Sequence, residues 1–192
     1  MPRLSSVDWT HAAADARTTE GTLLIGMGNP ILSDDAIGVR LAHDCARLLE
    51  LGGEVSVVEE CSVGGLNLLD IVAGYQRLIV LDSIKTTGGM PGTWYRFTAR
   101  SLRETMNLNN IHDANFATTL ELGRRMGIPL PDDDDIHIFA VEIDDNTTFS
   151  ERMTPALEES YPALLQEIWR ELAPLVCSGA DPSLQEVSTS WR

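Results

Sequence analysis

Short apolar segments alternate along this chain with stretches in which apolar residues recur at helical spacing. The clearest apolar segment, residues 77–84 (RLIVLDSI), is a nearly continuous run, as expected for a strand that is covered on both faces. Strands that alternate with helices are typical of a mostly parallel sheet whose helices lie on both of its faces. The sequence therefore predicts an α/β fold with three layers, α/β/α, around a twisted sheet.

Five strands and four main helices are predicted. The strands are expected at residues 22–27, 54–60, 77–84, 93–98 and 136–143, the fourth of them as an edge strand. The helices are expected at residues 34–50, 64–75, about 112–126 and about 154–172. We interpret residues 1–20 as an N-terminal extension, residues 21–176 as a single domain and residues 177–192 as a polar C-terminal tail.

The charge of the chain and its few cysteines narrow the class of protein. The formal net charge is −15 at pH 7, so the surface repels phosphate backbones and nucleic-acid binding is not expected. No apolar run approaches the roughly 18 residues that a membrane span needs, and the N-terminus lacks the apolar stretch of a signal peptide. Cys45, Cys61 and Cys177 are too widely spaced for a disulfide framework or a metal knuckle. These features predict a cytoplasmic protein without a membrane partner.

A glycine turn, Gly26-Met27-Gly28, follows the first predicted strand. It lacks the third glycine of a dinucleotide-binding turn, and the P-loop and G-x-S-x-G motifs are also absent from the sequence. Asp34 and Asp35 stand where the next helix is expected to begin, and they would repel a pyrophosphate there. The turn therefore suits a cation better than an anion.

Two further polar residues are expected at the same edge of the sheet. Asp82 ends the apolar run of residues 77–84, and His112 opens the third predicted helix. Open α/β sheets bind ligands at the carboxyl ends of their strands, so Asp35, Asp82 and His112 are predicted to converge. Two carboxylates and an imidazole suit a borderline divalent metal such as nickel or zinc, and they leave coordination positions open for substrate.

Each of these residues also has a purely structural interpretation. Ser33 or Asp34 is a candidate cap for the following helix. Asp82 can be a buried acid with a structural partner, and His112 can be an exposed residue at a helix start. The acidic run at residues 131–135 (PDDDD) is interpreted as a solvated loop rather than as a metal site.

Five motifs occur together over roughly residues 22–172: GMGNPILSDDAIG, LIVLDSI, PGTWYRF, IHDANFATTLELGRRMG and IFAVEI…MTPALEE. Together they resemble the hydrogenase maturation proteases, endopeptidases that process the large subunit of nickel-iron hydrogenases. The resemblance implies an α/β/α fold with a five-stranded twisted sheet. It implies that Asp35, Asp82 and His112 contact nickel. It also implies a set of residues that shape the site, namely Gly28, Asn29, Asp34, Gly64 and Gly65. Ala36 is a departure, because many members of the family have glycine after the acidic pair.

The resemblance also implies an order of events. The nickel arrives with the substrate, and Asp35, Asp82 and His112 recognise it before the protease removes a C-terminal extension from the large-subunit precursor. Asp35 or Asp82 is then the catalytic carboxylate that serves as the base. The loops at residues 85–92 and 106–110 are candidates for substrate discrimination, and a monomer is expected.

Three other functions fit parts of the pattern. A nickel-dependent chaperone or checkpoint protein that holds the large subunit without cutting it would use the same three ligands. A peptidyl-tRNA hydrolase-like esterase shares the opening GMGNP, but the continuation SDDAIG is acidic here and lacks histidine. A protease of the same fold that cleaves a different substrate is the third alternative, because peptide specificity depends on the shape of loops.

Overall fold

The computed structural model describes residues 21–49, 55–62, 65–105 and 111–176, and for residues 103–105 and 111–115 it describes the backbone only. The predicted N-terminal extension and polar tail, Cys177, Gly64 and the loop at residues 106–110 lie outside the described residues. The predicted domain limits therefore stay a prediction.

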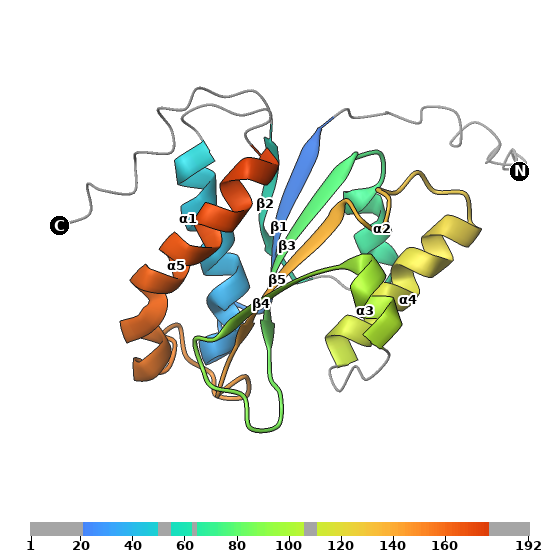
Figure 1. Ribbon diagram of the computed structural model, residues 1–192. Helices are drawn as coiled ribbons and strands as arrows, with labels where there is room; N and C mark the ends of the chain where they lie inside the picture. The colour runs from blue at the N-terminus through green and yellow to red at the C-terminus, as the bar shows by residue number, and fades with distance from the viewer. Residues whose placement is uncertain (1–20, 50–54, 63–64, 106–110, 177–192) are drawn as a thin grey trace, which may run out of the picture.

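One five-stranded sheet forms the middle layer, as predicted (Figure 1). Its strands are β1 (Thr22–Met27), β2 (Val55–Cys61), β3 (Arg77–Ile84), β4 (Trp94–Thr98) and β5 (Ile136–Glu142). They lie in the order β2-β1-β3-β5-β4, and every neighbouring pair is parallel except β4–β5, which is antiparallel. The predicted edge strand β4 does lie at the edge. The carboxyl ends of β1, β2, β3 and β5 consequently meet at one edge of the sheet.

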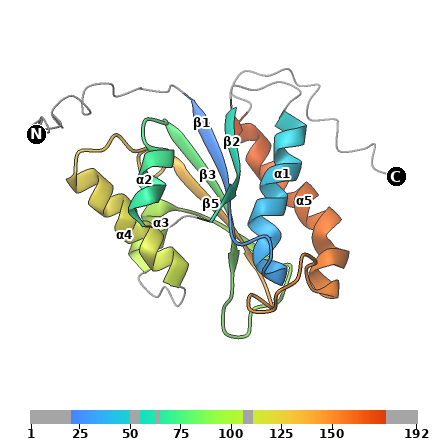
Figure 2. The same cartoon turned by 180° about the vertical axis from the view of Figure 1, so that it is seen from behind.

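Helices cover both faces of the sheet. Figures 1 and 2 show α1 and α5 on one face, and α2, α3 and α4 on the other. Their bounds are α1 (Ile37–Leu49), α2 (Leu66–Val72), α3 (Ala99–Thr105), α4 (Ile111–Arg125) and α5 (Pro155–Val176). The three-layer arrangement predicted from the sequence is thus confirmed. Within the part of the chain that the structure describes, no helix is long and apolar enough to cross a membrane.

The side chains of β3 alternate between two hydrophobic cores. Ile79 and Leu81 are buried in the core beneath α1 and α5. Leu78 and Val80 are buried in the core beneath α2, α3 and α4. Because successive side chains of a strand point to opposite faces, this alternation also determines where the polar residues at the end of β3 point.

Two helix predictions need correction. The helix expected from residue 34 is a 3-10 turn, η2 (Ser33–Ala36), which passes into α1 only at Ile37. Ser33, the first residue of this turn, has a φ of 45°, in the left-handed region that L-residues rarely adopt. The short helix α3 was not predicted, because its seven residues are too few for a clear helical period.

The acidic run at residues 131–135 is paired with arginines. Arg100 donates two hydrogen bonds to the Asp134 carboxylate, at 2.6 and 2.7 Å. These hydrogen bonds hold the pKa of the Asp134 carboxyl below its usual range. Asp133 forms an ion pair with Arg124. The run is therefore a loop, as interpreted from the sequence, in which Asp132 and Asp134 are exposed. Arginines tie it to neighbouring elements.

Candidate active site

The glycine turn after β1 lies against Asp35. Gly28 has a φ of +131°, and a Cβ atom there would stand 2.0 Å from the carbonyl oxygen of Asp35. The next amide, that of Asn29, donates a hydrogen bond of 2.9 Å to Asp35 Oδ2. Glycine at position 28 therefore lets the turn approach the acidic residue closely enough for a backbone amide to hold its carboxylate.

Replacing Gly28 with alanine is expected to lower the free energy of unfolding by about 2–4 kcal/mol, because the new methyl group meets backbone atoms in a conformation unfavourable for L-residues. Gly127→Ala is the matched control. Its φ is +76°, but a Cβ there has no atom within 4 Å, so only the backbone strain of about 1 kcal/mol remains. Chemical denaturation of both variants measures the difference, and equal losses would contradict the close approach at Gly28.

Asp34 points into the protein rather than into the site. Its side chain is fully buried. Oδ2 accepts hydrogen bonds from the amides of Asp144 and Asp145, at 3.2 and 3.1 Å. Thr154 donates from its amide to Oδ1 and from its hydroxyl to Oδ2, at 2.6 and 3.1 Å. Asp34 therefore fastens the loop between β5 and α5, and it does not cap its own helix, for η2 has no side-chain capping bond.

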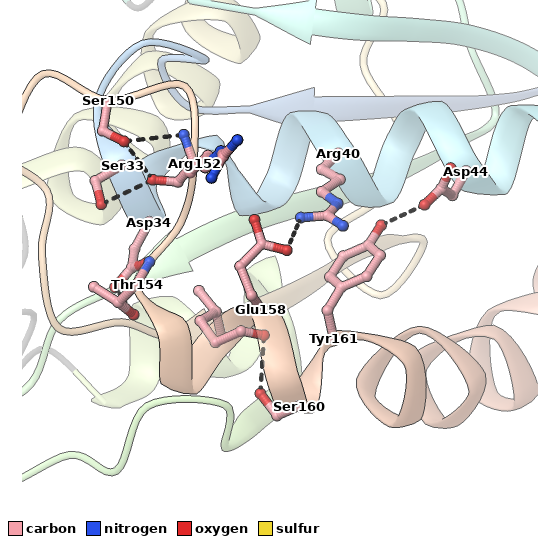
Figure 3. A network of polar contacts seen from close by, with 11 residues as sticks. Ser33, Asp34, Arg40, Asp44, Ser150, Arg152, Thr154, Glu158, Ser160 and Tyr161 are labelled. Carbon is pink, nitrogen blue, oxygen red and sulfur yellow. Dashed lines mark hydrogen bonds and ion pairs between the residues drawn. The ribbon is translucent and has the colours of Figure 1, made fainter.

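A wider polar network joins η2 and α1 to α5 and to the loop before it (Figure 3). Ser33 donates from its hydroxyl to the carbonyl oxygen of Arg152, at 3.4 Å. Further along, Arg40 of α1 forms an ion pair with Glu158 of α5, at 2.7 Å. The Tyr161 hydroxyl donates to Asp44 at 2.7 Å, and burial raises the pKa of that tyrosine. These contacts align α1 with α5 and so support the position of the turn.

Asp35 and Asp82 are linked through one residue, Ser83. The Ser83 hydroxyl donates a hydrogen bond of 2.7 Å to Asp35 Oδ1. The Ser83 amide donates a hydrogen bond of 2.8 Å to Asp82 Oδ1. All three residues are half-buried, so they lie at the protein surface and can meet a ligand. The structure thus brings together two of the three residues that the sequence predicted to converge.

The backbone of the third residue, His112, lies in the first turn of α4. Its side chain is outside the described residues. By the alternation along β3, Asp82 belongs to the face that α2, α3 and α4 cover, which is the face of His112. Among the side chains that the structure describes, no three of the histidine, cysteine, aspartate and glutamate type are grouped to hold a metal ion. The predicted three-ligand set therefore stays a prediction.

The predicted site-shaping residues differ in where they lie. Gly28 and Asn29 touch Asp35, and Asp34 is a buried structural residue. Gly65 precedes α2 with a φ of 63°, and a Cβ atom there would meet nothing within 4 Å. The positive φ therefore explains why position 65 is a glycine. Gly64 lies outside the described residues.

Sequence reasoning missed Ser83 and Glu142. Glu142 ends β5 and is fully buried. Thr86 donates to its two carboxylate oxygens from the amide and the hydroxyl, at 2.5 and 2.9 Å. Glu142 therefore anchors the start of the loop between β3 and β4, which passes beside the site. A glutamate directly after the apolar run of residues 138–141 was the available signal, because a buried carboxylate needs partners.

Comparisons with known proteins give the family. A model of the family described as hydrogenase maturation protease matches residues 39–171, a range that contains Asp82 and His112. Hydrogenase 2 maturation protease of Escherichia coli strain K12 is 34% identical over 71 residues, which span 37% of this chain and 43% of that protein. The alignment thus covers less than half of that relative's length.

Solved structures share the fold. The hydrogenase maturating endopeptidase HybD from E. coli superposes with a TM-score of 0.62 and 24% identity, over 80% of this chain and 93% of that one. The [NiFe] hydrogenase maturation protease HybD from Thermococcus kodakarensis superposes with a TM-score of 0.59 and 18% identity, over 80% of this chain and 99% of that one. At these identities the likeness concerns the fold, whereas the family model matches the sequence over more than half its length. The chain therefore belongs to the hydrogenase maturation protease family.

Proposed function

We propose that this protein is an endopeptidase that removes the C-terminal extension of a nickel-iron hydrogenase large-subunit precursor after nickel has been inserted. Membership of the family supports the reaction class and the substrate class. The observation that carries the proposal is the pair of carboxylates, Asp35 and Asp82, joined by Ser83 at the carboxyl edge of the sheet. This is the edge at which open α/β sheets bind their ligands.

The chemistry follows from two acids that are both hydrogen-bonded to Ser83 at the carboxyl edge of the sheet. Asp35 and Asp82 attract a cation, and we propose that the cation is the nickel carried by the substrate, with His112 as the third contact. Carboxylate oxygens and an imidazole nitrogen suit a borderline divalent metal, although other divalent metals can occupy such a site as well. One of the two carboxylates accepts a proton from the water that attacks the scissile peptide bond. Recognition and cleavage then use the same residues.

Intact-mass measurement tests this function directly. The purified protein is mixed with a nickel-loaded large-subunit precursor, and a metal-free precursor is treated in parallel. We expect the nickel-loaded sample alone to lose a defined C-terminal peptide. A tight complex with unchanged precursor mass would favour a chaperone or checkpoint protein instead. Cleavage of both samples would contradict nickel recognition, and no cleavage of any precursor would contradict the function.

Three exposed apolar side chains lie on loops that leave the carboxyl edge of the sheet, where the proposed site is. Ile31, Met90 and Phe149 are 49%, 73% and 79% exposed. They belong to the loops that follow β1, β3 and β5 at the carboxyl edge of the sheet (Figure 1). Exposed apolar residues on loops around a site are typical of protein interaction surfaces. We therefore assign substrate discrimination in part to Met90, which lies in the predicted loop of residues 85–92.

Replacing Met90 with serine should raise KM for the precursor by roughly 5- to 30-fold, equal to about 1–2 kcal/mol of binding free energy, with kcat little changed. Met126→Ser is the matched control, since Met126 is 61% exposed but follows α4, away from the carboxyl edge. Initial-rate kinetics on both variants measures the effect. An unchanged KM for the Met90 variant would remove this loop from substrate recognition.

The remaining proposals concern the state of the protein. A net charge of −15 disfavours binding to nucleic acid. We expect a monomer that works in the cytoplasm, because three widely spaced cysteines are typical of a reducing compartment. Size-exclusion chromatography with light scattering tests the monomer.

A further inference from the structure

We propose that Ser83 is a positioning residue, which holds the carboxylate of Asp35 at a set place relative to Asp82 and so raises the rate of cleavage. The inference rests on the proposed endopeptidase function. It concerns a residue that neither binds the peptide nor exchanges a proton with it. Its hydroxyl acts through Asp35, and its amide acts through Asp82.

The hydrogen bonds around Asp35 are the first part of the argument. Oδ2 accepts from the Asn29 amide at 2.9 Å, and Oδ1 accepts from the Ser83 hydroxyl at 2.7 Å. One donor on each oxygen prevents the carboxylate from rotating about its terminal bond, while each oxygen retains a lone pair. The distance to the hydroxyl is in the range of charge-assisted hydrogen bonds, which are roughly twice as strong as neutral ones. Asp35 is therefore oriented and still able to meet a ligand.

The position of Ser83 in β3 is the second part. Ile79 and Leu81 point to the face that α1 covers, and Ser83 continues that alternation. Its hydroxyl accordingly reaches Asp35, which lies two residues before the start of α1. Asp82 is directed to the other face, and its carboxylate turns back to the Ser83 amide. Ser83 thus joins Asp82, which is directed to one face of β3, to Asp35, which lies beside the other face.

The close packing of α1 on the sheet keeps this arrangement in place. A Cβ atom at Gly38 of α1 would stand 2.3 Å from the carbonyl oxygen of Met27 and 2.4 Å from that of Leu81. The first turn of α1 therefore lies directly on the ends of β1 and β3. Asp35, three residues earlier, is consequently brought within reach of a side chain as short as serine.

The consequence concerns rate rather than binding. A base or cation ligand misplaced by about 1 Å can cost on the order of 100-fold in rate, because the reacting groups no longer meet in a productive geometry. Loss of the Ser83 hydroxyl leaves Asp35 with the Asn29 amide as its remaining described donor. The precursor still docks on the surrounding loops, so its KM should change little.

Three variants test the proposal in the full-length protein with nickel-loaded precursor. Ser83→Ala removes the hydroxyl but keeps the amide, and Ser83→Thr restores a hydroxyl in a residue that suits a strand. Ser101→Ala is the control, because Ser101 is also half-buried and its hydroxyl donates to the Thr98 carbonyl oxygen. It lies in α3, which begins at the opposite edge of the sheet, beside the start of β5. We expect Ser83→Ala to lower kcat by about 10- to 100-fold with KM within about 3-fold of the wild type. Ser83→Thr should recover most of kcat, and Ser101→Ala should keep it.

A structural readout accompanies the kinetics. Crystal structures of the wild-type and Ser83→Ala proteins are expected to show the Asp35 carboxylate turned from its wild-type orientation in the variant, with α1 and β3 unmoved. Equal kcat for Ser83→Ala and wild type, an effect on KM alone, or a threonine variant as impaired as the alanine variant would each overturn the proposal. A wild-type protein that fails to cleave would instead overturn the proposed function, so the two failures are distinguishable.

Discussion

Replacing Asp82 with asparagine is expected to lower the rate of precursor cleavage at least about 1,000-fold. The amide keeps the shape of the side chain, and its carbonyl oxygen still accepts the hydrogen bond that the Ser83 amide donates at 2.8 Å. It loses the negative charge that attracts a cation and the basicity that accepts a proton. Intact-mass analysis of the nickel-loaded precursor over time measures the rate.

The control for this variant is a second carboxylate in a different place. Asp70 lies on α2 and is exposed, and Asp70→Asn removes the same charge from the protein surface. We expect it to cleave at the wild-type rate. The free energy of unfolding of both variants should lie within about 1 kcal/mol of the wild-type value, as is usual when an exposed or half-buried side chain is replaced by one of the same shape. An Asp82 variant of full activity would remove Asp82 from the mechanism.

The second large effect separates two neighbouring aspartates. Asp34→Asn should lower the free energy of unfolding by about 2–4 kcal/mol. Its carboxylate is fully buried and accepts four hydrogen bonds, from Asp144, Asp145 and twice from Thr154. An amide nitrogen in place of either oxygen faces an N–H donor and leaves it unsatisfied.

Asp35→Asn is the matched comparison, with the same chemical change one residue later. Asp35 is half-buried, and each of its two carboxylate oxygens accepts one hydrogen bond. The single oxygen of the asparagine amide can keep one of these two hydrogen bonds. We expect the free energy of unfolding of this variant to lie within about 1 kcal/mol of the wild-type value. Its rate of precursor cleavage should fall about 100-fold or more. Denaturant unfolding and intact-mass kinetics on the two proteins test whether one variant loses stability and the other loses activity. A stable Asp34 variant, or an active Asp35 variant, would contradict the division of labour between the two residues.

Much of the fold was readable in the pattern of apolar residues. All five strands were predicted: β3 is a nearly continuous apolar run, as expected for a strand buried on both faces, and β4 shows the alternation of an edge strand. The order of the strands was not predicted. The sheet order depends on which crossovers the helices make, and the local pattern of a strand holds no information on its neighbours.

The site was predictable in part, because the pattern of apolar residues also locates the ends of the strands. Asp35 follows β1 and Asp82 lies near the carboxyl end of β3, and the carboxyl ends of parallel strands meet at one edge whatever their order. Ser83 was missed because a serine near the end of a strand is unremarkable until the folded chain brings Asp35 within hydrogen-bonding distance of it. His112 stays a prediction, since its side chain is outside the described residues.

The sequence alone thus established the α/β class and the edge of the sheet at which the acids gather, because both follow from periodicity along the chain. It did not distinguish Asp34 from Asp35, which are identical neighbours in an acidic pair. That distinction arises from segments 110 to 120 residues away, whose amides and Thr154 hydroxyl surround Asp34 and bury it. The hydrogen bonds that made one aspartate structural and left the other at the surface come from residues that meet only after the chain has folded.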